Sequence, residues 1–224
     1  VELVQHMGED ITVVNSARVS FGVQKELLDE KDKKLINYLV KHKHTSTLEH
    51  NIATFRIKVP LFVRSQHHRH RTWSFNEISR RYTDADIKFY ETVNFRTQHK
   101  SNRQASNIDD TINPLIEIKS EACAKPMKIT ASDAILKYHN ECLKFFDQLL
   151  AAGICREQAR GVLPQNLYTE YYATANLNNI LKFIGLRTHE GAQWEIQQLA
   201  SAMLDIITNL WPETVNAYRS INCV

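Results

Sequence analysis

A short basic segment between Pro60 and Tyr82 holds most of the side chains that could do chemistry. It contains one acidic residue, Glu77, among five arginines and three histidines: Arg64, Arg69, Arg71, Arg80, Arg81, His67, His68 and His70. Guanidinium groups bind phosphates and carboxylates through paired, charge-assisted hydrogen bonds. The whole chain is nearly neutral, with 28 Lys and Arg against 25 Asp and Glu. The segment therefore favours small anionic ligands over nucleic acid; a solvated basic loop is the alternative for arginines alone.

The histidines and cysteines suggest two other kinds of site. Six of the ten histidines fall between residues 42 and 70, but zinc and iron usually take carboxylate or thiolate ligands beside histidine. The chain has no HExxH motif and no paired cysteines of metal-binding spacing, so we predict no metal site. The four cysteines, at positions 123, 142, 155 and 223, are predicted to be free thiols in a reducing compartment.

Composition excludes several classes of protein. The chain has 224 residues, of which 43% are hydrophobic, which is enough for a substantial core. Its six glycines are never spaced as GxGxxG or GxxxxGK[ST], which excludes a Rossmann fingerprint and a P-loop. No apolar run approaches the roughly 18 residues of a membrane span, and no secretory signal pattern opens the chain. We expect a cytoplasmic protein without membrane partners.

The elements that must position the basic segment are predicted from periodicity. Alternating apolar and polar residues predict strands over 53–59 and 167–175, and Pro60 suits the first position of a helix to about His67. Residues 73–82 are predicted to form an ordered loop or a short strand. Apolar residues at helical spacing predict helices over 10–19, 26–42, 132–152, 156–162, 179–186 and 191–210. Asp10, Ser132 or Asp133, and Asn178 are the predicted caps.

This order of elements predicts an α+β fold of one domain over residues 1–224, with a central antiparallel-type sheet flanked by long helices. Residues 98–110 include only two apolar side chains, Ala105 and Ile108. We predict a mobile excursion there, within a polar, insert-like stretch over about residues 84–132.

The basic segment also carries a family resemblance. Residues 69–82 read RHRTWSFNEISRRY and match the signature RHRxxSxNxxSxRY of the flavin-dependent thymidylate synthases, the ThyX family. Four further segments are similar to that family: ARVSF (17–21), KHKHTSTLEH (41–50), REQARGVLPQNLYT (156–169) and LRTHEGAQWEIQQ (186–198). The likeness covers about residues 1–83 and 133–210, and only the insert-like stretch interrupts it.

The resemblance implies the reductive methylation of dUMP to dTMP. Methylenetetrahydrofolate would give the carbon, reduced FAD would give the hydride, and NADPH would re-reduce the flavin. It also implies a homotetramer with active sites at subunit interfaces, and no nucleic-acid partner. The missing glycine motifs agree with the resemblance, because this family holds FAD without a Rossmann fold.

Position by position, the resemblance implies two sets of binding residues. The dUMP set is Gln66, Arg69, Glu77, Ser79, Arg80, Arg81, Arg160 and Arg187. The FAD set is His44, Ser46, Arg69, His70, Arg71, Glu77, Asn176, Asn178 and Lys182. Arg187 would be catalytic, because a guanidinium against the uracil favours its N3-deprotonated form. The alternative is that Arg187 only caps its own helix.

The resemblance further implies that His44 lies near the flavin ring and takes part in folate handling; a helix-dipole partner is the alternative. Ser79 has no adjacent general base in the sequence, so we assign it to ligand binding rather than to nucleophilic attack. Other thymidylate synthases attack dUMP with a cysteine, but Cys142 and Cys155 lack the context for that role. Hydride transfer without a covalent enzyme nucleophile is therefore expected.

The chain departs from the family pattern at several FAD positions. Asn178 and Lys182 stand where relatives commonly carry Arg and Asn, and Gly191 stands where they carry His. Ser46 replaces a common Thr and keeps the hydroxyl. FAD affinity or flavin exchange is expected to differ in consequence. Two other interpretations are a nucleotide- or RNA-binding module built on residues 64–82, with strongly salt-dependent binding, and a catalytically inactive member of the same fold.

Overall fold

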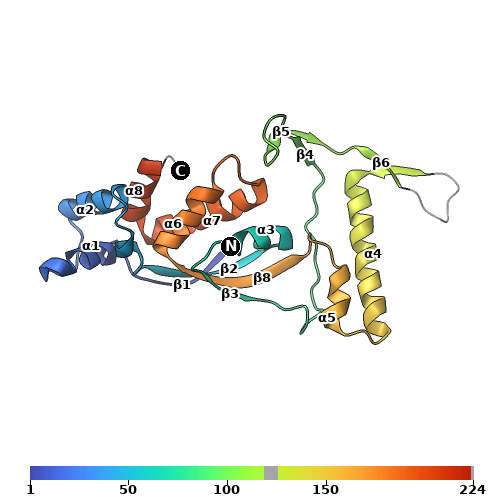
Figure 1. The fold of residues 1–224 in the computed structure, drawn as a ribbon, viewed down its shortest axis with the longest axis horizontal. Coiled ribbons are helices and arrows are strands. Elements are labelled where there is room, and N and C mark those ends of the chain that lie inside the picture. Colours follow the sequence, from blue (N-terminus) through green and yellow to red (C-terminus); the bar gives the residue numbers. More distant parts are fainter. Residues whose placement is uncertain (119–125, 223–224) are drawn as a thin grey trace. The chain divides into compact units, whose positions relative to one another are not determined.

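A computed structural model describes residues 1–118 and 126–222 (Figure 1). Its contacts divide the chain into two compact units. The first unit comprises Val1–Lys58, Gln66–Asn76 and Glu170–Val224, and the second comprises Val59–Ser65 and Glu77–Thr169. That residues 1–224 behave as one domain stays a prediction.

The main sheet has four strands in the order β1-β2-β8-β3. Their bounds are β1 Glu2–Met7, β2 Ile52–Pro60, β8 Tyr168–Asn176 and β3 Ser74–Glu77. β1 and β2 pair antiparallel. Between β2 and β8, Thr54 bonds Thr174 at 2.9 Å and Arg56 donates to Glu170 at 2.6 Å, so numbers rise on one strand as they fall on the other. The predicted α+β fold with an antiparallel sheet is confirmed.

Among the described residues, the first unit has five helices and two 3₁₀ turns: α1 Asp10–Arg18, η1 Val19–Phe21, α2 Glu30–Lys41, η2 Thr45–Leu48, α6 Leu177–Arg187, α7 Trp194–Leu210 and α8 Pro212–Asn222. Helices α1, α2 and α8 contact one another and are grouped at one end of this unit in Figure 1. Phe55, Ile57, Phe183, Met203 and Trp211 are fully buried. The sheet and these helices thus share an apolar core, as alternation on the strands and helical spacing require.

The second unit contains most of α3 Leu61–His67, together with α4 Ala131–Ala151, α5 Arg156–Ala159 and η3 Arg160–Val162. The stretch predicted to be insert-like also belongs to it. Its described residues form two antiparallel hairpins, β4 Phe95–Gln98 with β5 Ser106–Ile112, and β6 Leu115–Ile118 with β7 Met127–Thr130. Of the predicted excursion over 98–110, residues 99–105 form the connection between the two strands, whereas residues 106–110 belong to β5, which the sequence pattern does not predict; that the segment is mobile stays a prediction. Most of β5 is exposed on both faces, so its sequence has no alternation that predicts a strand.

The predicted helix caps need correction. Glu9, rather than Asp10, is the N-cap of α1, and Thr130, rather than Ser132 or Asp133, is the N-cap of α4. At α6 the N-cap is Asn176, whose side chain accepts a hydrogen bond from the backbone of Asn179 at 3.0 Å. The predicted cap, Asn178, instead lies inside the helix. Periodicity predicts neither β1 nor α8.

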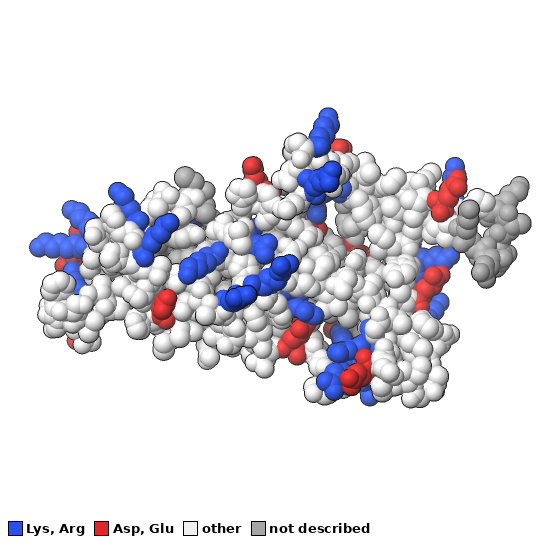
Figure 2. Space-filling model, in the orientation of Figure 1, with Lys and Arg blue, Asp and Glu red and all other residues white. Residues whose placement is uncertain are grey.

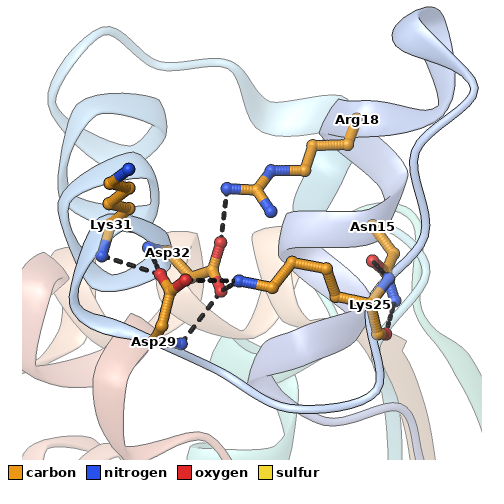
Figure 3. A network of polar contacts seen from close by, with 6 residues as sticks. All are labelled: Asn15, Arg18, Lys25, Asp29, Lys31 and Asp32. Carbon is orange, nitrogen blue, oxygen red and sulfur yellow. Dashed lines mark hydrogen bonds and ion pairs between the residues drawn. The ribbon is translucent and has the colours of Figure 1, made fainter.

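A buried carboxylate on α2 holds the segment between α1 and α2 against that helix (Figure 3). The Asp32 side chain is fully buried and pairs with Arg18 at 2.5 Å and with the ammonium of Lys25. Lys25 also pairs with Asp29 at 2.7 Å, and this hydrogen bond holds the pKa of Asp29 below its ordinary value. The buried charge is thus compensated by two cations and by the backbone N–H of Asp29.

In the part of the chain that the structure describes, every helix is too short or too polar to serve as a membrane span.

Candidate active site

A cavity of about 500 Å³ lies within the second unit; we call it the Ser79 cavity. Ser79 and Arg80 follow the end of β3, and Arg160 begins η3. Three arginines and one carboxylate line the cavity, together with hydroxyl and amide groups: Arg64, Arg80, Arg160, Glu77, Ser79, Gln165, Tyr168 and Thr169. An excess of guanidinium groups beside hydroxyls is suited to an anionic, oxygen-rich ligand.

Protein groups already engage the Glu77 carboxylate. It accepts a hydrogen bond of 2.6 Å from the hydroxyl of Thr169 on β8. The Nε atom of Arg64, on α3, lies 3.1 Å from the same carboxylate. Glu77 therefore balances one of the three cations that line the cavity, and the remaining charge is positive.

Arg80 holds the loop that follows β3. Its side chain is buried, and its Nη1 and Nη2 atoms donate to the carbonyls of Ala85 and Asp86 at 2.6 and 3.4 Å. Burial lowers the pKa of Arg80, and the charges of Asp86 and Asp84 oppose that shift. Arg81 is exposed, pairs with Glu157 at 3.3 Å and does not line the cavity. The two neighbouring arginines therefore face different surroundings.

A second cavity, of about 340 Å³, lies within the first unit; we call it the Arg187 cavity. Its lining contains basic, aromatic and amide side chains: Arg69, His70, Arg71, Thr72, Trp73, Asn179, Lys182, Leu186 and Arg187. No acidic side chain belongs to this lining, counted over the described residues. In Figure 2 the visible face over α2 and α6 shows more Lys and Arg than Asp and Glu side chains.

Arg187 ends α6 and reaches the segment that follows α3. Its Nε atom donates to Nε2 of His70 at 3.0 Å, and its Nη2 atom donates to the backbone carbonyl of Gln66 at 3.4 Å. These bonds go to another element rather than to the carbonyls of α6, while the charge of Arg187 lies in the last turn of α6, where the helix dipole favours a cation. Gln66 in turn donates through its amide to Gln193 at 2.5 Å.

Burial and neighbouring charge set the protonation of this pair. Burial, with the charge of Arg187, lowers the pKa of His70 to about 4. Burial, with the charge of Arg69, lowers the pKa of Arg187 from its high ordinary value. His70 is therefore neutral at pH 7, and its Nε2 atom can accept the bond from Arg187 only if its own proton is on Nδ1.

A buried histidine supports the segment that carries these groups. Nδ1 of His67 lies 2.9 Å from the hydroxyl of Tyr171, and the ring packs against Trp73 and Phe183 with centroids 4.7 and 4.6 Å apart. Burial lowers the pKa of His67 to about 3. A neutral imidazole in an aromatic cluster thus anchors the chain between Gln66 and His70.

A third pocket, of about 270 Å³, lies within the first unit and is mostly apolar; we call it the His44 pocket. His44, Lys43, Asn178 and Lys182 lie among its lining residues, and Lys182 also lines the Arg187 cavity. Asn178 is buried, and its amide donates to Glu49 at 3.2 Å. Lys43 has a φ of 56°, an uncommon conformation for a residue with a side chain. Backbone strain of this kind is often found at binding sites.

The predicted residues fall into these three places. Glu77, Ser79, Arg80 and Arg160 line the Ser79 cavity; Arg69, His70, Arg71, Lys182 and Arg187 line the Arg187 cavity; His44, Asn178 and Lys182 line the His44 pocket. Four predicted residues line none of them: Ser46, which is exposed; Asn176, which caps α6; Arg81; and Gln66, which contacts Arg187 through its carbonyl.

Several lining residues have no role that the sequence predicts, chiefly Arg64, Tyr168, Trp73 and Asn179. In the sequence, Arg64 is only one of the five arginines of the basic segment. The alternation of the strand around Tyr168 predicts which side of the sheet this tyrosine faces, but it does not predict which residues lie on that side.

The described residues test the predictions of free cysteines and of no metal site only in part. Cys142 is half-buried on α4, Cys155 is exposed, and both are free thiols; Cys123 and Cys223 lie outside the described residues. Over residues 1–118 and 126–222, no three His, Cys, Asp or Glu side chains are grouped so that they could hold a metal ion. For the chain as a whole, the absence of a metal site stays a prediction.

Known proteins resemble this chain over nearly its full length. The family model described as "Thymidylate synthase complementing protein" matches residues 2–213. A flavin-dependent thymidylate synthase of Thermus thermophilus is 41% identical over 212 residues, which cover 95% of this chain and 72% of that protein. The one from Thermotoga neapolitana is 40% identical over 219 residues, covering 97% and 89%.

A solved structure agrees with these matches. The UMP/dUMP methylase PolB of Streptomyces cacaoi, bound with 5-Br dUMP, superposes with a TM-score of 0.77 at 30% identity, covering 100% of this chain and 95% of that one. The predicted fold class, the enzyme class and the flavin dependence are confirmed by these relatives. This chain belongs to the family of flavin-dependent thymidylate synthases.

Proposed function

We propose that this enzyme methylates dUMP to dTMP with methylenetetrahydrofolate as carbon donor, and that NADPH reduces its bound FAD. One observation carries the proposal: His70 and Gln66 hold the Arg187 guanidinium at the edge of a cavity that no described acidic residue lines. dUMP, FAD, NADPH and the folate are all anions, so a basic cavity complements each of them.

The lining of the Arg187 cavity fits FAD. Arg69, Arg71 and Lys182 offer cations for its pyrophosphate, and Trp73 offers an aromatic face for a ring. We assign His44, Ser46, His70, Glu77, Asn176 and Asn178 to the same cofactor. When bound, reduced FAD would supply the hydride that completes the methyl group. The protein's own task is to bind, orient and polarise.

For dUMP, we assign the phosphate to Ser79, Arg80, Arg81 and Arg160, and the remainder of the nucleotide to Gln66, Arg69, Glu77 and Arg187. Ser79 and Arg160 line the same cavity. Arg187 faces the uracil and stabilises its N3-deprotonated form. Its guanidinium is already fixed by two hydrogen bonds, so little reorganisation is needed as negative charge develops on the ring.

We propose that no enzyme side chain attacks the pyrimidine. The Ser79 hydroxyl accepts a hydrogen bond from the backbone of Arg81 at 3.3 Å, and no described general base activates it. Cys142 and Cys155, the two free thiols in the described residues, line none of the three cavities. We also propose a homotetramer with active sites at subunit interfaces, which analytical ultracentrifugation would test.

An anaerobic assay tests the reaction. Purified protein is supplied with FAD, NADPH, dUMP and methylenetetrahydrofolate, and flavin absorbance and dTMP are followed together. The proposal predicts bleaching of the flavin by NADPH, followed by reoxidation in step with dTMP formation. Bleaching without dTMP would contradict the proposed substrates, and a protein that binds no flavin would contradict the assigned cofactor site.

A further inference from the structure

We propose that Arg64 is a further binding residue for the nucleotide phosphate, a role that rests on the proposed use of dUMP. Arg64 lies on α3 and lines the Ser79 cavity together with Ser79 and Arg160. All of these residues belong to the second unit, so the arrangement is internal to it.

The first observation concerns the hydrogen bonds of Arg64. Its guanidinium lies beside Glu77, with Nε 3.1 Å from the carboxylate, but the geometry of this ion pair gives no hydrogen bond. The Nε atom is buried and has no hydrogen-bond partner within the described part of the chain. Buried polar groups in folded proteins nearly always have partners. Because Nε faces Glu77, the donors left for a ligand in the cavity are those of the two Nη nitrogens, which hydrogen-bond to no described residue.

The second observation concerns the other arginines of the cavity. Arg80 already donates to two backbone carbonyls, so its donors are largely committed to the loop that follows β3. Arg160 is exposed, and its side chain has no polar partner among residues 1–118 and 126–222. Arg64 and Arg160 thus have more donors left for a phosphate than Arg80 has, beside the hydroxyl of Ser79.

The third observation concerns orientation. The Arg64 side chain is 29% exposed, and the Glu77 carboxylate beside it also accepts a bond from Thr169. Glu77 is therefore fixed by a second element and holds the guanidinium in place before the ligand arrives. A preorganised and partly desolvated cation binds phosphate more strongly than a flexible surface cation does.

The experiment compares dUMP with deoxyuridine, which lacks the phosphate. Calorimetry would give the affinity of each for the wild-type protein and for Arg64→Gln, with and without flavin. We expect Arg64→Gln to weaken dUMP binding about 10- to 100-fold and to leave deoxyuridine binding unchanged. Arg64→Lys keeps the charge but loses the planar fork, so its affinity for dUMP should lie between those of the wild-type protein and Arg64→Gln.

A matched control is Arg56→Gln. Arg56 also pairs through Nε with a glutamate, Glu170, but lines none of the three cavities. The Arg56→Gln variant should therefore bind dUMP with wild-type affinity. Thermal unfolding of each variant checks that it folds. Equal losses for both ligands, or wild-type dUMP affinity in Arg64→Gln, would overturn the assignment of Arg64 while leaving the reaction in place. A wild-type protein that binds no dUMP would overturn the proposed function as well.

Discussion

Nε of Arg187 donates a hydrogen bond to Nε2 of His70 at 3.0 Å, although 117 residues separate the two in the sequence. The bond requires a neutral imidazole with its proton on Nδ1. It therefore joins the orientation of the proposed catalytic guanidinium to the protonation of a histidine in the same cavity.

The first prediction concerns Arg187. Arg187→Ala should lower kcat for dTMP formation by roughly 100- to 1,000-fold, because the cation that stabilises the pyrimidine anion is lost. Flavin binding should persist, since the other cations of the cavity remain. Arg187→Lys keeps the charge without the fixed fork and should recover part of the rate. Single-turnover rates and flavin absorbance measure the two effects, and loss of flavin together with activity would show that Arg187 holds the cofactor instead.

Ser79 separates ligand binding from covalent catalysis. Ser79→Ala should raise the Kd for dUMP and keep measurable turnover, because the serine is assigned to the phosphate rather than to attack on the ring. One hydrogen bond to a charged group contributes about 1.5–3 kcal/mol, which corresponds to roughly 10- to 100-fold in affinity. Calorimetry and steady-state assays test this. Complete loss of turnover with normal dUMP affinity would support a nucleophilic serine.

The depressed histidine pKa values predict how stability changes with pH. Burial is the main cause for both His70 and His67, whose pKa values fall to about 4 and about 3 from an ordinary 6.5. Between pH 6.5 and about 4 the unfolded chain therefore binds protons that the folded chain does not. The free energy of unfolding should fall as the pH drops through this window.

Urea unfolding at about pH 7.5 and about pH 5 checks this linkage. His70→Asn offers an amide oxygen to Arg187 and does not titrate, so this variant should lose less stability on acidification than the wild type. Identical losses in the two proteins would show that His70 does not contribute to the pH dependence.

Sequence patterns predict elements well where one face is buried. On β8, Thr169, Tyr171, Ala173 and Ala175 are buried in alternation, and that alternation is visible in the sequence. The hairpin strand β5 is mostly exposed on both faces, so its sequence carries no such signal. Elements without a buried face therefore escape prediction from periodicity alone.

Local chemistry alone does not identify helix caps or sites. Asn176 and Asn178 are equally good caps by type; Asn176 caps α6 because β8 ends there, whereas Asn178 bonds Glu49, 129 residues away. The family resemblance named Arg187 and His70, but only the fold brings them together. Neither the sequence pattern nor the family resemblance predicts the ion pair between Arg64 and Glu77.

The last prediction concerns the buried carboxylate of Asp32. Its side chain is fully buried between Arg18 and Lys25 and accepts a bond from the backbone of Asp29 (Figure 3). Asp32→Asn removes the buried negative charge that Arg18 and Lys25 share, although Lys25 keeps its pair with Asp29, so the free energy of unfolding should fall. Chemical denaturation should show that loss in the free energy of unfolding. Lys33→Gln, which removes surface ion pairs with Glu30 on the same helix and with Glu213 on α8, should change stability little. If the two variants lose the same amount, the Asp32 network does not stabilise the segment between α1 and α2.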